Sequence, residues 1–66
     1  MKTLTDLLRN EPFKPFTIHL TGGQTLEVGY RESVAKSPIS EDVCIFTADG
    51  RFHLTNTHHM VDFEVG

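Results

Sequence analysis

The feature that most constrains the fold is a regular alternation of apolar and polar residues within residues 15–28. Apolar side chains fall at Phe16, Ile18 and Leu20 and return at Leu26 and Val28, with a Gly-Gly pair between the two runs. Alternation of this kind is typical of a strand with one buried face, and the glycines suit a turn. The sequence therefore predicts a β-hairpin in which Leu20 faces Leu26 and Ile18 faces Val28.

A second hairpin is predicted around the dipeptide Asp49-Gly50. The segments on either side are rich in β-branched and aromatic residues, and Asp-Gly is a strong signal for a tight hairpin turn. A two-residue turn at this point would pair Ile45 with Leu54. Two hairpins in so short a chain favour a small β-barrel.

The remaining elements follow from local signals. Thr3 can cap a short helix over residues 3–10, with Asp6 completing a capping box, and Pro12 ends it. The strands are expected at about residues 15–21, 24–35, 43–48, 51–56 and 60–65, with Val61, Phe63 and Val65 on one face of the last. All 66 residues then form a single domain.

The predicted third strand is apolar on both faces. Val43 and Ile45 lie on one side, and Cys44 and Phe46 lie on the other. One face can fill a barrel, but the other needs cover from the N-terminal helix or from a neighbouring subunit. A chain of this size without a disulfide also has little core of its own. We therefore expect a homo-oligomer.

Charge and composition weigh against some classes of partner. The net charge is −3 at pH 7, and the six Lys and Arg residues are scattered along the chain. Nucleic-acid binding normally needs clustered positive charge, so RNA is disfavoured as a partner. The lone Cys44 suits a reducing cytoplasm, the N-terminal residues do not resemble a signal peptide, and no apolar run approaches ~20 residues. The sequence thus predicts a cytoplasmic protein without a membrane segment.

The order of helix and five strands resembles the Sm-like barrel family, which includes bacterial Hfq. Residues 18–26 look like the first hairpin of that family, and residues 56–63 sit where Hfq has a basic turn with a histidine before its last strand. His58 or His59 could match that histidine, whereas the adjacent lysine and the basic rim of the family are missing. The resemblance implies a mainly β fold: a short N-terminal helix followed by a five-stranded Sm-like or SH3-like small barrel.

A second resemblance is to small uncharacterised bacterial proteins that open on Pro-Phe-x-Pro-Phe-x-Ile. Residues 12–20 and the Asp-Gly hairpin at residues 49–52 match this pattern. The match covers most of the chain and implies no activity.

The residues that could form a catalytic or metal-binding site have simpler structural explanations. The histidines His19, His53, His58 and His59 invite a metal site, for example at His19 beside Glu27, but scattered surface histidines are the simpler explanation of the same residues. Cys44 could meet His53 or Thr55 across the second hairpin, yet its apolar surroundings favour a buried structural thiol. We therefore predict no enzyme and no catalytic, cofactor-binding or metal site.

The predicted function is macromolecule binding without catalysis, most simply protein–protein interaction through a self-associating barrel. A divergent Hfq-like RNA-binding protein is the alternative, and a small-ligand or metal-sensing barrel is a third reading. Exposed aromatic side chains could stack on RNA bases, although alternation places Phe52 and Phe63 inward. Residues expected at a partner or RNA contact are His58, His59, Asn56, Phe46, Tyr30 and Arg51.

Overall fold

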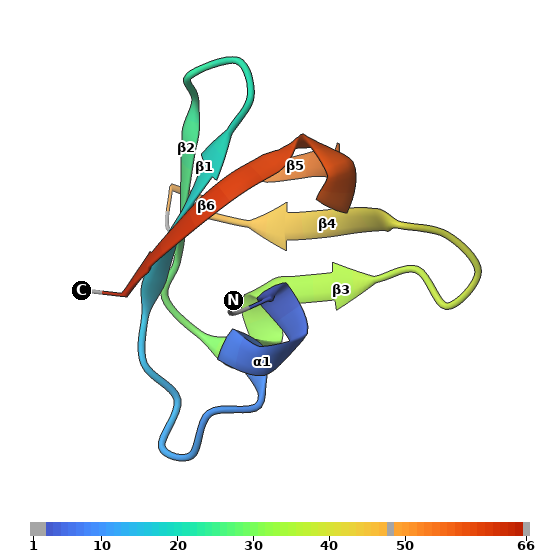
Figure 1. Cartoon of the computed structure of the whole chain (residues 1–66). Helices are drawn as coiled ribbons and strands as arrows, with labels where there is room; N and C mark the ends of the chain where they lie inside the picture. Colours follow the sequence, from blue (N-terminus) through green and yellow to red (C-terminus); the bar gives the residue numbers. More distant parts are fainter. Residues whose placement is uncertain (1–2, 48, 66) are drawn as a thin grey trace.

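The computed structural model describes residues 3–47 and 49–65, which form a mainly β fold with a short N-terminal helix (Figure 1). In chain order the elements are α1 Leu4–Leu8, β1 Phe16–Leu20, β2 Thr25–Val28, η1 Arg31–Ser33, β3 Val34–Lys36, β4 Asp42–Phe46, β5 Phe52–Asn56, η2 Thr57–His59 and β6 Met60–Val65, where η marks a 3₁₀ turn. The predicted fold class is thus confirmed at this level. Residues 1–2, 48 and 66, which the predicted domain and third strand include, lie outside the described residues.

The strands form two antiparallel sheets of three strands each, ordered β2-β1-β6 and β3-β4-β5. Within the described residues no strand pairing joins the two sheets, so the predicted closed five-stranded barrel is not confirmed. Figure 1 shows the sheets crossing steeply, with α1 beside β3. The core between them consists of Leu4, Leu7, Phe16, Ile18, Leu26, Val28, Val43 and Ile45. No helix in the described part of the chain has the length and apolar character needed to cross a membrane.

The helix begins as predicted but is shorter. The Thr3 hydroxyl accepts a hydrogen bond from the backbone N–H of Asp6, and the Asp6 carboxylate accepts one from the backbone N–H of Thr3. This second bond is the main cause that holds the pKa of Asp6 below its ordinary value. The hydrogen bond with the Thr3 hydroxyl is the next largest cause. The helix ends at Leu8 rather than at residue 10, with Arg9 as its C-cap. The capping box therefore fixes the helix start, so that Leu4 and Leu7 are buried in the core.

The single bent strand predicted over residues 24–35 is instead two strands in different sheets. β2 ends at Val28, and β3 begins at Val34 after the one-turn helix η1. Within η1, the guanidinium of Arg31 donates hydrogen bonds to the backbone oxygens of Leu8 (2.7 Å) and Asn10 (2.6 Å). The chain is thereby anchored to the end of α1 at the point where it passes from one sheet to the other.

The first hairpin has the predicted faces but a tighter register. Ile18 lies opposite Leu26, and Phe16 lies opposite Val28, a shift of two residues from the expected pairing. The cause is a short turn, because the backbone N–H of Leu20 bonds to the oxygen of Gln24 and Gly23 adopts a φ of 85°. A glycine accepts this left-handed conformation without a steric cost. A shift of two residues leaves every side chain on its expected face.

The second hairpin differs from the prediction by one residue. Leu54 lies opposite Cys44 rather than Ile45, and Phe52 lies opposite Phe46. The backbone N–H of Thr47 bonds to the oxygen of Arg51, so three residues rather than two separate the paired ends. A shift of one residue reverses the faces of the strand. The prediction that Phe52 points inward is therefore wrong, since its side chain is 60% exposed.

The last strand follows its predicted span, but of the three apolar residues predicted on one face, Phe63 and Val65 share a face and Val61 does not. β6 pairs with β1 so that Met60 faces Leu20 while Asp62 faces His19, which leaves Val61 out of register at a bulge. Val61 is consequently exposed, whereas Phe63 packs edge-on against Phe16 in the core. The inward prediction thus holds for Phe63 but not for Val61.

Candidate functional site

The main candidate surface is the side of sheet β3-β4-β5 that faces away from the core. Along β4 the side chains alternate, so that Val43 and Ile45 are buried while Cys44 and Phe46 point to the other side. Antiparallel partners opposite each other share a face, which adds the residues paired with them. We call the resulting set the outer β4–β5 face; it consists of Ala35, Cys44, Phe46, Phe52 and Leu54.

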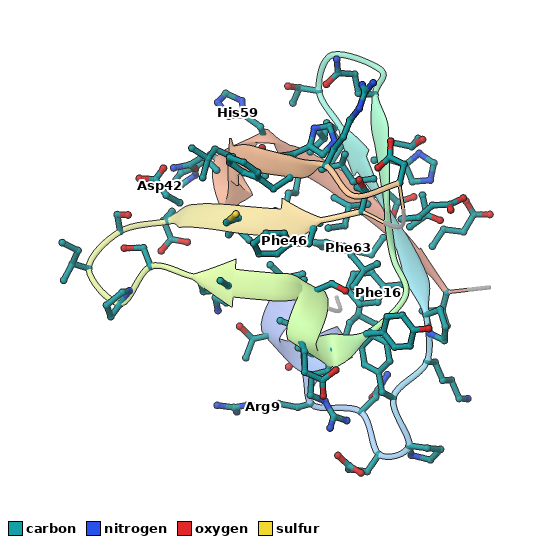
Figure 2. The ribbon with its side chains drawn as sticks, turned by 180° about the vertical axis from the view of Figure 1, so that it is seen from behind. Arg9, Phe16, Asp42, Phe46, His59 and Phe63 are labelled. Carbon is teal, nitrogen blue, oxygen red and sulfur yellow. The ribbon has the colours of Figure 1, made fainter. Side chains whose placement is uncertain are left out.

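The helix does not cover this face. Leu4 and Leu7 of α1 belong to the same buried cluster as Val43 and Ile45, which places the helix on the core side of the sheet. Figure 2 views the molecule from the opposite side, where Phe46 is labelled at the end of β4 and α1 lies behind β3. The sequence predicted that either the N-terminal helix or a neighbouring subunit covers the second apolar face of this strand. The helix does not cover this side of β4.

The face is apolar and open to solvent. Leu54 is 75% exposed, Phe46 is 52% exposed, and the rings of Phe46 and Phe52 lie 6.0 Å apart between centroids. Cys44 is half-buried and has Leu54 and Ala35 as its cross-strand neighbours, so the expected contact with His53 or Thr55 is not made. The thiol agrees only in part with the predicted buried structural cysteine, because it is half-buried. A surface of this kind can bind by burying apolar area.

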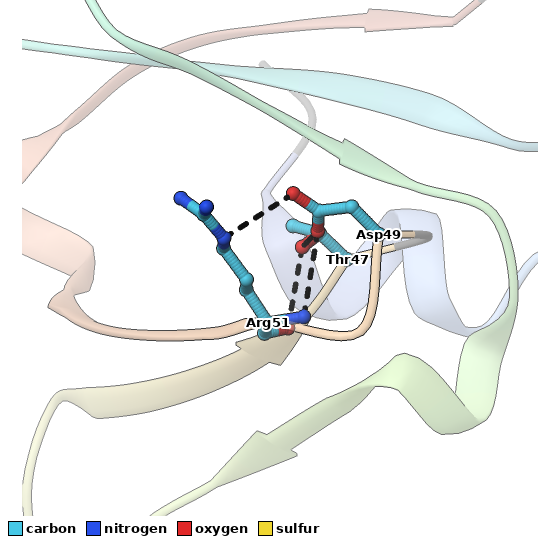
Figure 3. A network of polar contacts seen from close by, with 3 residues as sticks. All are labelled: Thr47, Asp49 and Arg51. Atoms are coloured by element: carbon cyan, nitrogen blue, oxygen red, sulfur yellow. Dashed lines mark hydrogen bonds and ion pairs between the residues drawn. The ribbon is translucent and has the colours of Figure 1, made fainter.

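A polar network closes the hairpin at the end of this face (Figure 3). The Thr47 hydroxyl donates to the Asp49 carboxylate, which also accepts a hydrogen bond from the backbone N–H of Arg51 (3.4 Å). The bond from Thr47 is the main cause that holds the pKa of Asp49 below its ordinary value. The guanidinium of Arg51 is largely exposed and lies 3.8 Å from Asp49. Arg51 is thus a hairpin residue whose charge is partly balanced within its own turn.

The turn before β6 gathers three of the predicted contact residues. Asn56 caps η2, because its side-chain oxygen accepts a hydrogen bond from the backbone N–H of His58 (2.9 Å). The Asn56 amide also donates to Asp42 (3.2 Å). The backbone oxygen of His59 accepts from Thr21, which ties η2 to the β1–β2 turn. His58 and His59 are exposed, and their capping residue is bonded to a carboxylate.

The predicted contact residues therefore do not form one site. Asn56 pairs with Asp42 at one end of the β4–β5 hairpin, whereas Phe46 and Arg51 lie at the other end. Tyr30 is 72% exposed just before η1, on the connection between the two sheets. Sequence reasoning missed Phe52 and Leu54 as surface residues. The sequence did contain a signal for them: the outer side of β4 is apolar, and the residues paired with it on β5 must share that face.

The outer side of the other sheet is acidic. His19 lies opposite Asp62, and its Nε2 lies 3.1 Å from a carboxylate oxygen of Glu64. The expected neighbour Glu27 lies opposite Thr17 instead. In the part of the chain that the structure describes, no group of three or more His, Cys, Asp or Glu side chains could hold a metal ion. The two outer sides thus differ in kind: one is acidic, and the other is apolar except at the end formed by Asp42 and Asn56.

A hollow of about 340 Å³ lies between α1 and β6, with Leu4, Met60 and Phe63 among the residues that line it. Its polar side chains already have partners: Lys36 donates to the Thr5 hydroxyl, and Glu41 accepts from the Thr57 hydroxyl, each at 2.6 Å. Small-ligand sites usually hold a few polar groups free to orient a ligand. The outer β4–β5 face is therefore the stronger candidate.

Comparisons of the chain with protein-family models, with curated proteins and with solved structures give no match.

Proposed function

We propose that this protein is a non-enzymatic module of Sm-like or SH3-like type that associates with itself and binds another macromolecule, in the first place a protein. The observation that carries this proposal is the outer β4–β5 face, where aromatic and aliphatic side chains stand exposed in a small domain. Exposed apolar patches of this kind mark interaction surfaces in soluble proteins. The acidic net charge favours a protein over a nucleic acid as the partner.

Strand edges add to the support for self-association. Among the described residues, β5 and β6 each lie at the edge of a sheet and pair with one neighbour, so each leaves a row of backbone groups open to another chain. β6 also presents Val61 and Val65 as exposed apolar side chains. Edges that carry apolar residues favour pairing with a further strand, because the added chain satisfies hydrogen bonds and buries area together.

We expect the folded protein to be an oligomer at micromolar concentration. Light scattering across a dilution series should give a mass above that of one chain, and the thermal midpoint should rise with concentration by mass action. Bovine serum albumin in the same buffer serves as the control for mass calibration. A monomer whose midpoint is the same at all concentrations would contradict the proposal.

RNA binding is the second candidate, and one observation favours it. Tyr30, Phe46 and Phe52 are exposed aromatics, and such rings can stack on the bases of single-stranded RNA. The positive charges of the protein favour RNA binding less, because three basic side chains already bond to other groups of the fold. Arg31 bonds to backbone oxygens, Lys36 bonds to Thr5, and Arg51 pairs with Asp49.

We expect no tight binding of A-rich or U-rich RNA at pH 7.5 and physiological salt. Acidic side chains would repel phosphate. Any weak binding should fall in the double variant His58→Ala/His59→Ala. Fluorescence anisotropy with labelled RNA measures both effects, with His53→Ala as the matched control. Submicromolar binding at pH 7.5 with a steep salt dependence would promote the RNA function over the protein one.

A further inference from the structure

We propose that the free edge of β6, together with the hollow between β6 and α1, binds an extended segment of another protein in which basic and apolar residues alternate. The segment would lie beside β6 as an added strand of sheet β2-β1-β6. This inference rests on the protein-binding function proposed above and names its surface and the chemistry of its partner. It assigns the open edge of β6 to the partner and leaves the open edge of β5 to association between copies.

The pairing of β1 determines which backbone groups of β6 face the free edge. The N–H of Leu20 donates to the oxygen of Gln24 across the first hairpin. Because backbone groups alternate in direction along a strand, those of Ile18 also point toward β2 and not toward β6. Phe63, which lies opposite Ile18, therefore turns its N–H and C=O away from β1, and the same alternation applies to Val65. The backbone of another extended segment can satisfy such a row of donors and acceptors.

A side-chain carboxylate covers part of this edge in the free protein. The N–H of Phe63 donates to the carboxylate of the preceding residue, Asp62 (2.9 Å), as expected for a group outside the ladder with β1. Charged side chains at a sheet edge protect it from indiscriminate pairing with other strands. A docked segment would offer a backbone oxygen to this N–H in place of the carboxylate, and Asp62 would then be free to contact a basic side chain of the segment.

The hollow of about 340 Å³ lies along the same edge. It is lined both by Phe63, whose ring packs against the core, and by Asp62, on the outer side of the sheet. Because neighbouring residues of a strand point to opposite faces, a hollow that reaches both lies beside the strand, and β1 occupies the other side. Leu4 of α1 also lines the hollow. A segment beside β6 would therefore rest its apolar side chains on Leu4, Met60 and Phe63.

Charge beside the edge defines the partner. Asp62 and Glu64 lie on the outer side of β6, and Glu41 lines the hollow. Lys36 also lines the hollow, and its ammonium group donates to the Thr5 hydroxyl. Since the whole chain carries a net charge of −3, this edge attracts a basic segment more strongly than a second copy of the chain. Side chains of an added strand alternate between two faces, so basic residues would meet Asp62 and Glu64 while apolar residues enter the hollow.

The test uses a fluorescein-labelled synthetic peptide of alternating residues, Lys-Val-Lys-Leu-Lys-Val-Lys. The control peptide, Lys-Lys-Val-Leu-Val-Lys-Lys, has the same composition and charge, but its apolar residues are grouped and cannot share one face of a strand. Fluorescence anisotropy at physiological salt should give a dissociation constant at least about fivefold lower for the alternating peptide.

Two charge reversals separate the β6 edge from the acidity of the sheet as a whole. Asp62→Lys places a positive charge at the proposed contact, and Glu27→Lys places one on the same side of the sheet, on β2. Both side chains are exposed, so neither change removes core packing. Binding of the alternating peptide should weaken at least about tenfold in Asp62→Lys and less than about threefold in Glu27→Lys. Far-UV circular dichroism confirms that both variants are folded.

Amide hydrogen exchange of the wild-type protein, followed by NMR, detects the same contact without a variant. The N–H groups of Phe63 and Val65 face the free edge, so their exchange should slow several-fold when the alternating peptide is added. The N–H of Glu64 points toward β1, and its exchange should change little.

The outcomes separate this inference from the proposal on which it rests. Equal binding of the two peptides, or equal losses in Asp62→Lys and Glu27→Lys, overturns the β6 groove and leaves the light-scattering result for the oligomer unaffected. A change of oligomer mass in Asp62→Lys without a change in peptide binding identifies a second copy as the occupant of the edge, which also overturns the inference. A protein that neither associates with itself nor binds either peptide contradicts both.

Discussion

Replacing Ile18 with alanine is expected to lower the free energy of unfolding by about 2–5 kcal/mol, the range for truncating a buried aliphatic side chain. Ile18 is fully buried and lies opposite Leu26, which is also in the core, so Leu26→Ala should cause a loss in the same range. Urea unfolding followed by circular dichroism measures both losses. All variants must be compared at one protein concentration, because self-association shifts the midpoint.

Thr17→Ala is the matched control, one position before Ile18 on the same strand. Thr17 lies on the outer side of β1, opposite Glu27, and its loss should cost less than about 1 kcal/mol. The double variant Ile18→Ala/Leu26→Ala should depart from the sum of the single losses, since the two side chains share one contact. Equal losses for Thr17→Ala and Ile18→Ala would mean that the strand is turned over relative to this structure.

The alternation of β1 and β2 shows what the sequence could and could not predict. A period of two assigns each side chain to a face, and the buried positions Phe16, Ile18 and Leu26 follow from it. The pairing of the two strands depends on the turn, and alternation is silent on turn length. The error in the first hairpin was two residues, which preserves faces, so the predicted core survived.

The second hairpin had the same kind of error with a different result. Asp49-Gly50 suggested a two-residue turn, but Gly50 adopts a φ of 84° within a turn of three residues between Thr47 and Arg51. One extra residue moves Phe52 from the inner to the outer side. The sequence therefore predicted the part of the candidate face on β4, but it did not predict the part on β5.

Side-chain contacts between residues far apart in the chain could not be predicted from the sequence. The alternation around Gly29 suggested one bent strand, and no local pattern indicates that a side chain 21 residues from Asn10 bonds to its backbone oxygen. Such a contact depends on the assembled fold rather than on periodicity. The same holds for the exposure of Val61, which follows from a bulge in the pairing of β1 with β6.

Arg31 is expected to be the polar residue with the largest effect on stability. Its guanidinium donates to the backbone oxygens of Leu8 and Asn10, lies 2.7 Å from the Glu11 carboxylate and stacks over the ring of Phe13 at 5.6 Å. Arg31→Ala leaves two carbonyls without their charged donor and frees the end of α1 from η1. Because the side chain is 40% exposed, water replaces part of the loss, and we expect a cost of about 1–3 kcal/mol in urea unfolding.

Two further variants separate geometry from charge. Arg31→Lys keeps the positive charge but lacks the planar fork that reaches both carbonyls, so it should recover less than half of the stability lost in Arg31→Ala. Arg51→Ala removes an equal charge from a side chain that is 80% exposed and pairs with Asp49 at 3.8 Å, and it should cost less than about 1 kcal/mol. If Arg31→Lys were as stable as the wild type, charge alone would account for the effect. If Arg31→Ala and Arg51→Ala were equal, the link between α1 and η1 would contribute nothing to the fold.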